Sequence, residues 1–377
     1  MKEGHLHPTP STQHPTPIYF LPGPPRRASR RLLRHVCAVA LALFLALSHS
    51  TALCNEADKC SFTVLYTAQS RGQIRSCDCN KFRYGGLGRA ATYMRSVREL
   101  ASDLVAVEGG DFLAKDSAEG RLRAEVFADY LKMMRYAAVV PGEREAVLPT
   151  DFLRQFDKDV GGIFVCANML DAEGGKLLLR PYVVTKLPCG VRIGVIGVLD
   201  PLLLAPYGKL SNTPTLTDPS EALKKHLPEM RKQCDVALLI AHANSTRTED
   251  LAAVARADFV IATHGAPRER PIAEGEMTVS KPTSKVAGAV FFECATQWSW
   301  SVGALDVTVN GGKVAKCANS LVYLGRAVKE DSAMVTVYND YDAKLKKLAQ
   351  ERRDKMSERV RESLQARKPD NPNKAQD

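Results

Sequence analysis

Residues 104–111 read LVAVEGGD, an apolar run that ends in two glycines and an aspartate. Three later segments follow the same plan: AAVVPGERE at 137–145, VALLIAH at 236–242 and FVIATH at 259–264. Such runs are typical of buried strands, and a polar residue just past a buried strand lies at the edge of the sheet where ligands bind. The four segments therefore predict an α/β fold with a site at that edge.

The polar side chains that end these segments are Asp111, Glu143, His242 and His264. One aspartate, one glutamate and two histidines make a plausible four-ligand site for a divalent cation. The alternative is structural, since a histidine at the end of a strand is more often a packing residue. In that case the side chains hydrogen-bond across the sheet ends, and one of the acids pairs with Arg71 or Arg144.

The rest of the chain alternates apolar runs of strand length with amphipathic stretches. Strands are predicted at 62–67, 104–107, 137–140, 163–166, 181–187, 191–198, 236–240 and 259–262. Helices are predicted at 87–100, 121–134, 221–232 and 333–365, and three β-rich runs lie between 289 and 324. This order suggests one α/β domain with two facing sheets and outer helices.

The net charge of +10 is carried by the two ends of the chain. Residues 1–52 hold six basic residues against one acid, and residues 343–377 hold eleven against six. The stretch between them holds 35 of each sign. A nucleic-acid partner is therefore not expected, because the central domain has no excess of positive charge.

Residues 1–52 predict a leader and a secretory signal. Five arginines between positions 26 and 34 precede the apolar run Val36–Leu47, and small residues follow it. That run is too short for a permanent bilayer-spanning helix, so we expect an exported protein, periplasmic or extracellular, without a stable transmembrane span. A lipoprotein anchored through Cys54 is the alternative, although Leu53 stands where a lipobox has a small residue.

Export makes disulfides possible for the cysteines of the mature chain. Cys166, Cys234 and Cys294 lie in apolar runs and are expected to be small buried hydrophobic residues. Cys77 and Cys79 instead lie in a polar loop beside the first strand. This pair can ligate metal, exchange disulfides or staple its loop to a distant cysteine, and all three alternatives stay open.

The order and spacing of short motifs carry a family resemblance. The motifs are Leu65-Tyr-Thr67, Gly72-Gln73, Gly85-Gly-Leu-Gly-Arg89, Gly109-Gly-Asp111, Gly142-Glu-Arg-Glu145, Ala167-Asn168, Gly194-Val-Ile-Gly-Val198, His242 and Thr263-His264. With them, the chain resembles the phosphoesterase domain of the 5'-nucleotidase branch of the calcineurin-like metallophosphoesterases. The resemblance implies a four-layer α-β-β-α sandwich over residues 60–330. The residue pattern predicts that a charged helix at 331–366 and a disordered tail at 367–377 come after this domain.

The resemblance also implies a metal centre. In the family one aspartate bridges two metal ions, and that position is Asp111 here. The other ligands of the second ion fall at Glu143, His242 and His264. Ligand positions of the first ion are occupied by Gln69, Arg71 and Ala266. One site is therefore intact and the other degenerate, which implies one divalent ion, such as Mn²⁺ or Zn²⁺, or none.

The family's catalytic histidine is replaced by Arg144. A guanidinium holds phosphate in bidentate geometry, but it is a poor general acid because its pKa exceeds about 12. Arg71 and Arg144 thus predict a small phosphorylated or otherwise anionic ligand. Three functions remain: a metal-dependent hydrolase of phosphate esters or nucleotides, a non-catalytic metal- or anion-binding descendant, and a thiol-redox accessory that uses Cys77 and Cys79.

Overall fold

The computed structural model describes residues 59–76, 84–173, 175–208, 210–265, 277–278, 284–286, 288–293 and 299–366. Several predictions concern residues outside these ranges: the secretory signal, the anchor at Cys54, the Cys77–Cys79 pair, Cys294, the degenerate position Ala266 and the tail at 367–377. They stay predictions. Within the described helices, none is long and apolar enough to cross a bilayer.

The first sheet has the strand order β10-β14-β13-β1-β2-β3. Its members are β1 (Lys59–Thr67), β2 (Leu104–Glu108), β3 (Ala138–Val139), β10 (Met277–Thr278), β13 (Ser301–Asn310) and β14 (Lys313–Tyr323). β1, β2 and β3 run parallel, and β13 lies antiparallel to β1. The β13–β14 hairpin turns at Gly311-Gly312, and both glycines have positive φ.

The second sheet has the strand order β11-β12-β9-β8-β6-β5. Its members are β5 (Tyr182–Lys186), β6 (Arg192–Leu199), β8 (Val236–His242), β9 (Phe259–Ala262), β11 (Ser284–Val286) and β12 (Ala289–Glu293). β6, β8, β9 and β12 are parallel, which suits their continuous apolar runs. β5 and β6 form an antiparallel hairpin. A separate two-stranded ladder pairs β4 (Met169–Leu170) with β7 (Thr215–Leu216).

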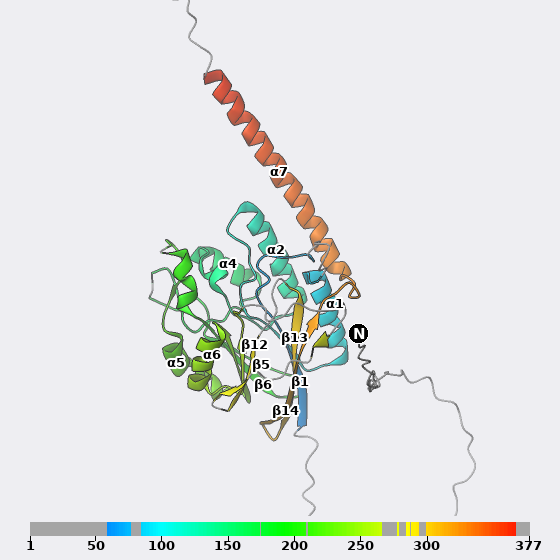
Figure 1. Ribbon diagram of the computed structural model, residues 1–377, viewed down its shortest axis with the longest axis vertical. Coiled ribbons are helices and arrows are strands. Elements are labelled where there is room, and N and C mark those ends of the chain that lie inside the picture. The colour runs from blue at the N-terminus through cyan, green and yellow to red at the C-terminus, as the bar shows by residue number, and fades with distance from the viewer. Residues whose placement is uncertain are drawn as a thin grey trace, which may run out of the picture. The chain divides into compact units, whose positions relative to one another are not determined.

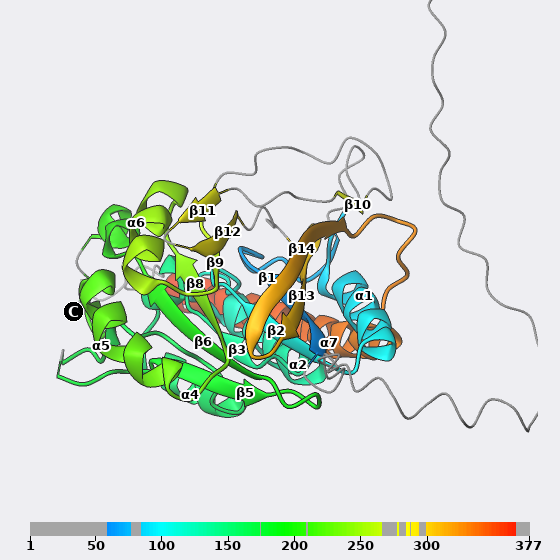
Figure 2. The ribbon, with the colours of Figure 1, turned by 90° about the horizontal axis from the view of Figure 1, so that it is seen from below.

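Helices cover the outer faces of both sheets, which gives four layers and confirms the predicted α-β-β-α sandwich. Successive residues of β1 point to opposite faces, so Val64 packs between the sheets and Leu65 packs under the helices. α1 (Leu87–Leu100), α2 (Ala118–Met133) and the first part of α7 (Ser332–Ala366) cover the first sheet (Figure 1). α5 (Pro219–Arg231) and α6 (Ser245–Ala255) cover the second, on the side away from β1 and β13 (Figure 2).

Three short helical elements were not predicted: α3 (Glu143–Ala146), α4 (Thr150–Asp159) and the 3-10 helix η2 (Pro201–Tyr207). α4 buries only Thr150, Leu153 and Phe156, and η2 buries none of its residues, so neither has a full apolar face. The strand predicted at 163–166 is wrong. These residues make only isolated bridges, through Phe164 and Val165.

The C-terminal helix α7 divides into a packed part and an exposed part. Met334, Tyr338 and Tyr341 are buried against the core under the first sheet. Farther along, the apolar residues Met356 and Val360 are exposed. The packed part therefore joins the domain, and the rest presents its apolar residues to solvent.

A disulfide links Cys60 in β1 to Cys189 in the turn between β5 and β6. It joins the two sheets across 129 residues of sequence, a pairing that the sequence alone did not indicate. Cys166 and Cys234 are buried free thiols, as expected from their apolar runs.

Candidate metal and anion site

The four predicted ligand residues come together where parallel strands of both sheets end. Asp111 follows β2, and Glu143 opens α3 after β3 in the same sheet. His242 is the last residue of β8, and His264 follows β9 in the second sheet. Because the two sheets face each other, their carboxyl ends converge on one place, the position at which α/β sheets bind ligands.

Glu143 is the centre of this cluster. Its Oε2 lies 2.7 Å from Nε2 of His242, and its Oε1 lies 3.4 Å from Nε2 of His264. Donor atoms of these three residues all lie within 4.8 Å of one another. Asp111 Oδ1 lies 3.7 Å from Nε2 of His242. Both Asp111 and His242 are fully buried, so the cluster is largely shielded from solvent.

The second nitrogen of His242 is held by the protein. Nδ1 lies 2.6 Å from the carbonyl oxygen of Gly109 and 3.2 Å from Oγ1 of Thr263, whose hydroxyl also donates to Gly109. An Nδ1–H that donates to a backbone carbonyl fixes the ring and directs Nε2 to the cluster. Histidines that ligate metal are commonly oriented in this way.

Glu145 shapes the site from behind and was not singled out from the sequence. This fully buried carboxylate accepts backbone N–H groups from Asp111 at 2.7 Å, Leu113 at 2.8 Å and Gly142 at 2.9 Å. Asp111 has a positive φ of 58°, a conformation that is costly for a residue with a Cβ. The three bonds to Glu145 tie the β2 and β3 loops together around it. The repeated acid in Gly-Glu-Arg-Glu was the available signal.

Two polar atoms of the cluster have no hydrogen-bond partner among the described residues. They are Oδ2 of Asp111 and Nδ1 of His264, and both are buried. Buried polar atoms are rarely left unsatisfied, and a carboxylate oxygen in this position is a natural ligand for a cation. The donor set and its unsatisfied oxygen therefore fit a divalent metal ion. The role of these residues as metal ligands stays a prediction.

Burial and mutual charge shift the pKa values of the cluster. Burial disfavours the cation of His242, but Asp111 and Glu143 outweigh it and raise the pKa of this histidine to about 9. Burial raises the pKa of Asp111 to about 8, and the charge of His242 opposes the shift. For Glu143, burial would raise the pKa, yet hydrogen bonds from both histidines hold it well below its usual range. The acids therefore require positive charge beside them, which protons or a divalent cation can supply.

The two arginines flank Asp111. Arg71 has a positive φ of 51°, and its backbone N–H donates to the carbonyl of Asp111 at 2.7 Å. Its guanidinium donates to Oε1 of Gln69, whose amide group donates to the carbonyl of Thr263. Arg144 donates its backbone N–H to Oδ1 of Asp111 at 3.0 Å and its Nε–H to the carbonyl of Leu113. Gln69 is thus a structural bridge between the sheets.

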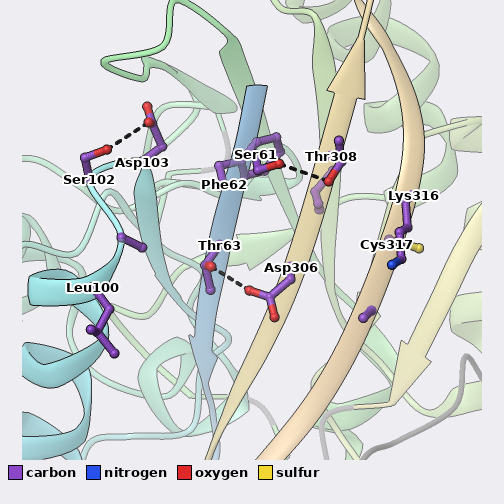
Figure 3. Close-up of a pocket in the computed structure, with 13 residues that line it drawn as sticks. Ser61, Phe62, Thr63, Leu100, Ser102, Asp103, Asp306, Thr308, Lys316 and Cys317 are labelled. Atoms are coloured by element: carbon purple, nitrogen blue, oxygen red, sulfur yellow. Dashed lines mark hydrogen bonds between the residues drawn. The ribbon is translucent and has the colours of Figure 1, made fainter. Parts of the chain in front are cut away.

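A cavity of about 550 Å³ lies elsewhere, between α1 and strands β1, β13 and β14 (Figure 3). It opens beside the amino-terminal part of β1, whereas ligands of α/β sheets bind at carboxyl ends. Its acids already have partners: Asp306 accepts from Thr63 at 2.6 Å, and Asp103 accepts from Ser102 at 3.1 Å. We therefore place the candidate site at the Asp111 cluster.

The chain is similar in sequence and in fold to several known proteins. A 2',3'-cyclic-nucleotide 2'-phosphodiesterase/3'-nucleotidase of Yersinia enterocolitica is 29% identical over 224 residues, which are 54% of this chain and 34% of that protein. The 5'-nucleotidase precursor of Thermus thermophilus superimposes with a TM-score of 0.63 at 21% identity, over 77% of this chain and 60% of the other. The calcineurin-like phosphoesterase YfkN of Bacillus subtilis also superimposes with a TM-score of 0.63, at 18% identity, over 77% of this chain and 99% of the other.

These comparisons confirm the resemblance to the 5'-nucleotidase-like branch of the metallophosphoesterases. The two solved structures show the shared fold. No protein-family model matches the chain. The chain spans 27% to 39% of the length of the curated relatives that it matches, so their whole activities do not transfer directly.

Proposed function

We propose that this chain, a relative of the 5'-nucleotidase-like metallophosphoesterases, is an exported hydrolase of phosphate esters that uses one divalent metal ion. The observation that carries the proposal is the convergence of Glu143, His242 and His264, whose donor atoms lie within 4.8 Å of one another beside Asp111. Export through residues 1–52, ahead of a domain over 60–330, is part of the proposal. Sequencing the amino terminus of the mature protein tests that part, and an uncleaved signal would contradict it.

The residues divide into two roles. Asp111, Glu143, His242 and His264 would hold the ion. A divalent ion held by these residues would supply Lewis-acid chemistry for a phosphoryl oxygen. Arg71 and Arg144, which bracket Asp111 through backbone hydrogen bonds, supply guanidinium groups for the remaining phosphate oxygens. Burial of the cluster strengthens these interactions because little water screens them.

Metal analysis together with turnover tests this proposal. We expect one ion per chain in the purified protein and hydrolysis of phenyl phosphate in the presence of Mn²⁺ or Zn²⁺. His242→Ala removes a buried candidate ligand. Metal content should therefore fall below half an ion per chain, and the rate of turnover should fall by at least about 100-fold. His226→Ala, on the outer helix α5, is the matched control and should keep the metal content and the turnover of the wild type. Turnover that survives chelation, or is unchanged in His242→Ala, would falsify the proposal.

A second function is favoured by two positions: Gln69, which corresponds to a ligand of the first metal ion in the family, and Arg144, which corresponds to the family's catalytic histidine. The Gln69 side chain is committed to the carbonyl of Thr263, and Arg144 Nε to the carbonyl of Leu113. Neither group generates a nucleophile, which favours a non-catalytic protein that binds a metal ion or an anion. The same measurements separate the two functions, because this one predicts stoichiometric metal without turnover.

A further inference from the structure

An apolar cavity of about 290 Å³ adjoins the candidate site. Three charged residues line it, Arg144, Lys115 and Asp116, and Asp116 is paired with Arg121. Tyr207, Leu210 and Val147 form apolar parts of its wall. The backbone N–H of Arg144 also donates to Asp111 at 3.0 Å, so this residue is shared by the cavity and the candidate site. Ligand pockets combine an apolar wall with a few polar groups in this way.

The segment that supplies Tyr207 is unusually apolar for its exposure. η2 reads PLLLAPY, and none of its residues is fully buried. Tyr207 is 40% exposed and Leu210 is 44% exposed. Proline at positions 201 and 206 restricts the backbone, so the wall is held in a defined conformation.

Electrostatics place Tyr207 close to the charged cluster. Burial raises the pKa of Tyr207 above its ordinary value, and the charges of Glu143 and Asp111 add to this shift. Arg144 and Arg71 oppose it. The ring is therefore within electrostatic range of both the acids and the two candidate phosphate-binding arginines.

The chemistry of Arg144 restricts which esters suit this cavity. A guanidinium does not protonate a departing oxygen near neutral pH, because its pKa exceeds about 12. An alkoxide leaving group needs such a proton, whereas a phenol, with a pKa near 10, departs more readily as its anion. A ring that fills the apolar cavity is also the kind of group that leaves without acid assistance.

We propose that the cavity formed by Tyr207, Leu210 and Val147 is the leaving-group subsite, and that the substrates are phosphate monoesters of small aromatic alcohols. In the reaction, water adds to phosphorus, the P–O bond to the ring oxygen breaks, and that oxygen leaves with the bond's electron pair. The products are the phenolate, which solvent protonates, and inorganic phosphate, which retains the protons of the attacking water until solvent takes one up. This inference rests on the proposed function for the chemical step, and on the cavity alone for ring binding.

A cavity of about 460 Å³ beside Arg71 is less suited to the ring. It is lined by the ion pairs Arg75–Asp342, at 2.8 Å, and Arg123–Glu119, at 2.8 Å. Placing a ring there would cover charged groups without offering them partners. The apolar wall on the Arg144 side is the better fit.

The test separates ring binding from turnover. The affinities of phenylphosphonate and methylphosphonate, which are not hydrolysed, are measured calorimetrically for the full chain loaded with Mn²⁺. We expect the wild type to prefer the phenyl compound by about tenfold, from stacking and apolar burial. Tyr207→Ala and Leu210→Ala should reduce this preference to about twofold or less, with methylphosphonate affinity unchanged.

Two further variants sharpen the result. Tyr207→Phe retains the ring and should keep the preference, which separates stacking from any role of the hydroxyl group. Leu202→Ala changes a leucine of η2 that is 72% exposed and does not line the cavity, and it should behave as wild type. Circular dichroism confirms that each variant is folded.

The outcomes distinguish this inference from the proposed function. Hydrolysis of phenyl phosphate with an unchanged phosphonate preference in Tyr207→Ala overturns the subsite and leaves the hydrolase intact. Loss of the preference in Tyr207→Ala supports the subsite even when the wild type shows no turnover, in which case only the hydrolase is contradicted. Equal affinity of the wild type for both phosphonates, or no binding of either, overturns the subsite.

Discussion

Asp111 combines two unfavourable features in one residue. It has a positive φ of 58°, and its Oδ2 is buried without a partner among the described residues. Strained or unsatisfied groups persist only where neighbouring contacts stabilise them, and they gather at functional sites. Here the stabilising group is Glu145, whose carboxylate accepts three backbone N–H groups around Asp111.

Glu145→Ala should therefore destabilise the protein strongly. It leaves three buried N–H groups without their acceptor, each at a cost of about 1 kcal/mol or more, so we expect the free energy of unfolding to fall by at least about 3 kcal/mol. Denaturation by urea measures the change. Glu249→Ala, an exposed glutamate of α6, is the control and should change stability by less than about 0.5 kcal/mol. Equal effects of both substitutions would exclude this role of Glu145.

Glu108 should make stability depend on pH. Burial raises the pKa of this carboxyl to about 8, a shift that the bond from Thr67 opposes and the charge of Glu145 enlarges. Because its folded pKa lies above its unfolded pKa, its stabilising contribution is complete below about pH 4 and is lost as the pH rises through about 8. The free energy of unfolding is measured at pH 6 and at pH 9. Its decrease from pH 6 to pH 9 should be larger in the wild type than in Glu108→Gln. Equal falls would show that Glu108 does not titrate as described.

At the scale of elements, α7 holds the loop that carries Arg71. The hydroxyl of Tyr338 donates to the carbonyl of Ile74 at 2.7 Å and accepts the N–H of Gly88 at 2.8 Å. Beside it, Arg75 forms a bidentate pair with Asp342 of the same helix. The helix thus reaches the site indirectly, by fixing the backbone from which the candidate phosphate-binding arginine extends.

Tyr338→Phe removes both hydroxyl bonds and keeps the ring. We expect a loss of about 1 to 3 kcal/mol in the free energy of unfolding, since a buried carbonyl and a buried N–H lose their partner. Amide hydrogen exchange should also quicken within residues 71–76. Tyr93→Phe is the control, because that hydroxyl has no hydrogen-bond partner among the described residues. Unchanged exchange at 71–76 would argue against a role for α7 in holding the loop.

At the scale of the whole molecule, the disulfide between Cys60 and Cys189 connects the two sheets. A link across 129 residues restricts the unfolded chain considerably, and the chain-entropy relation gives about 5 kcal/mol for a loop of this length. That is comparable with the whole stability of many domains. The disulfide therefore supports the alignment of the sheets whose ends form the site.

Replacing both cysteines by serine should lower the free energy of unfolding by up to about 5 kcal/mol, and reduction of the wild type should have a similar effect. Thermal and urea denaturation with and without reductant provide the measurement. Cys317→Ser, which changes a free and partly exposed thiol, should leave stability nearly unchanged. If reductant has no effect on the wild type, the crosslink does not contribute as described.

The sequence by itself determined the layered fold and most of its elements. The helix predicted at 87–100 has the bounds of α1, and the strand predicted at 259–262 has those of β9. Such elements follow from hydrophobic periodicity, which is a local property of the chain. The motif spacing also brought Asp111 and His242 into the candidate site before their distances were known.

Tertiary structure alone decided the rest. Four features were not anticipated from the sequence. They are the disulfide between Cys60 and Cys189, the contact of His242 Nδ1 with Gly109, the hydrogen bonds to Glu145 and the cavity wall at Tyr207. Each depends on contacts between segments far apart in sequence, or on where a short irregular element comes to rest. No local pattern encodes these distances, because they arise only when the two sheets pack face to face and bring their carboxyl ends together.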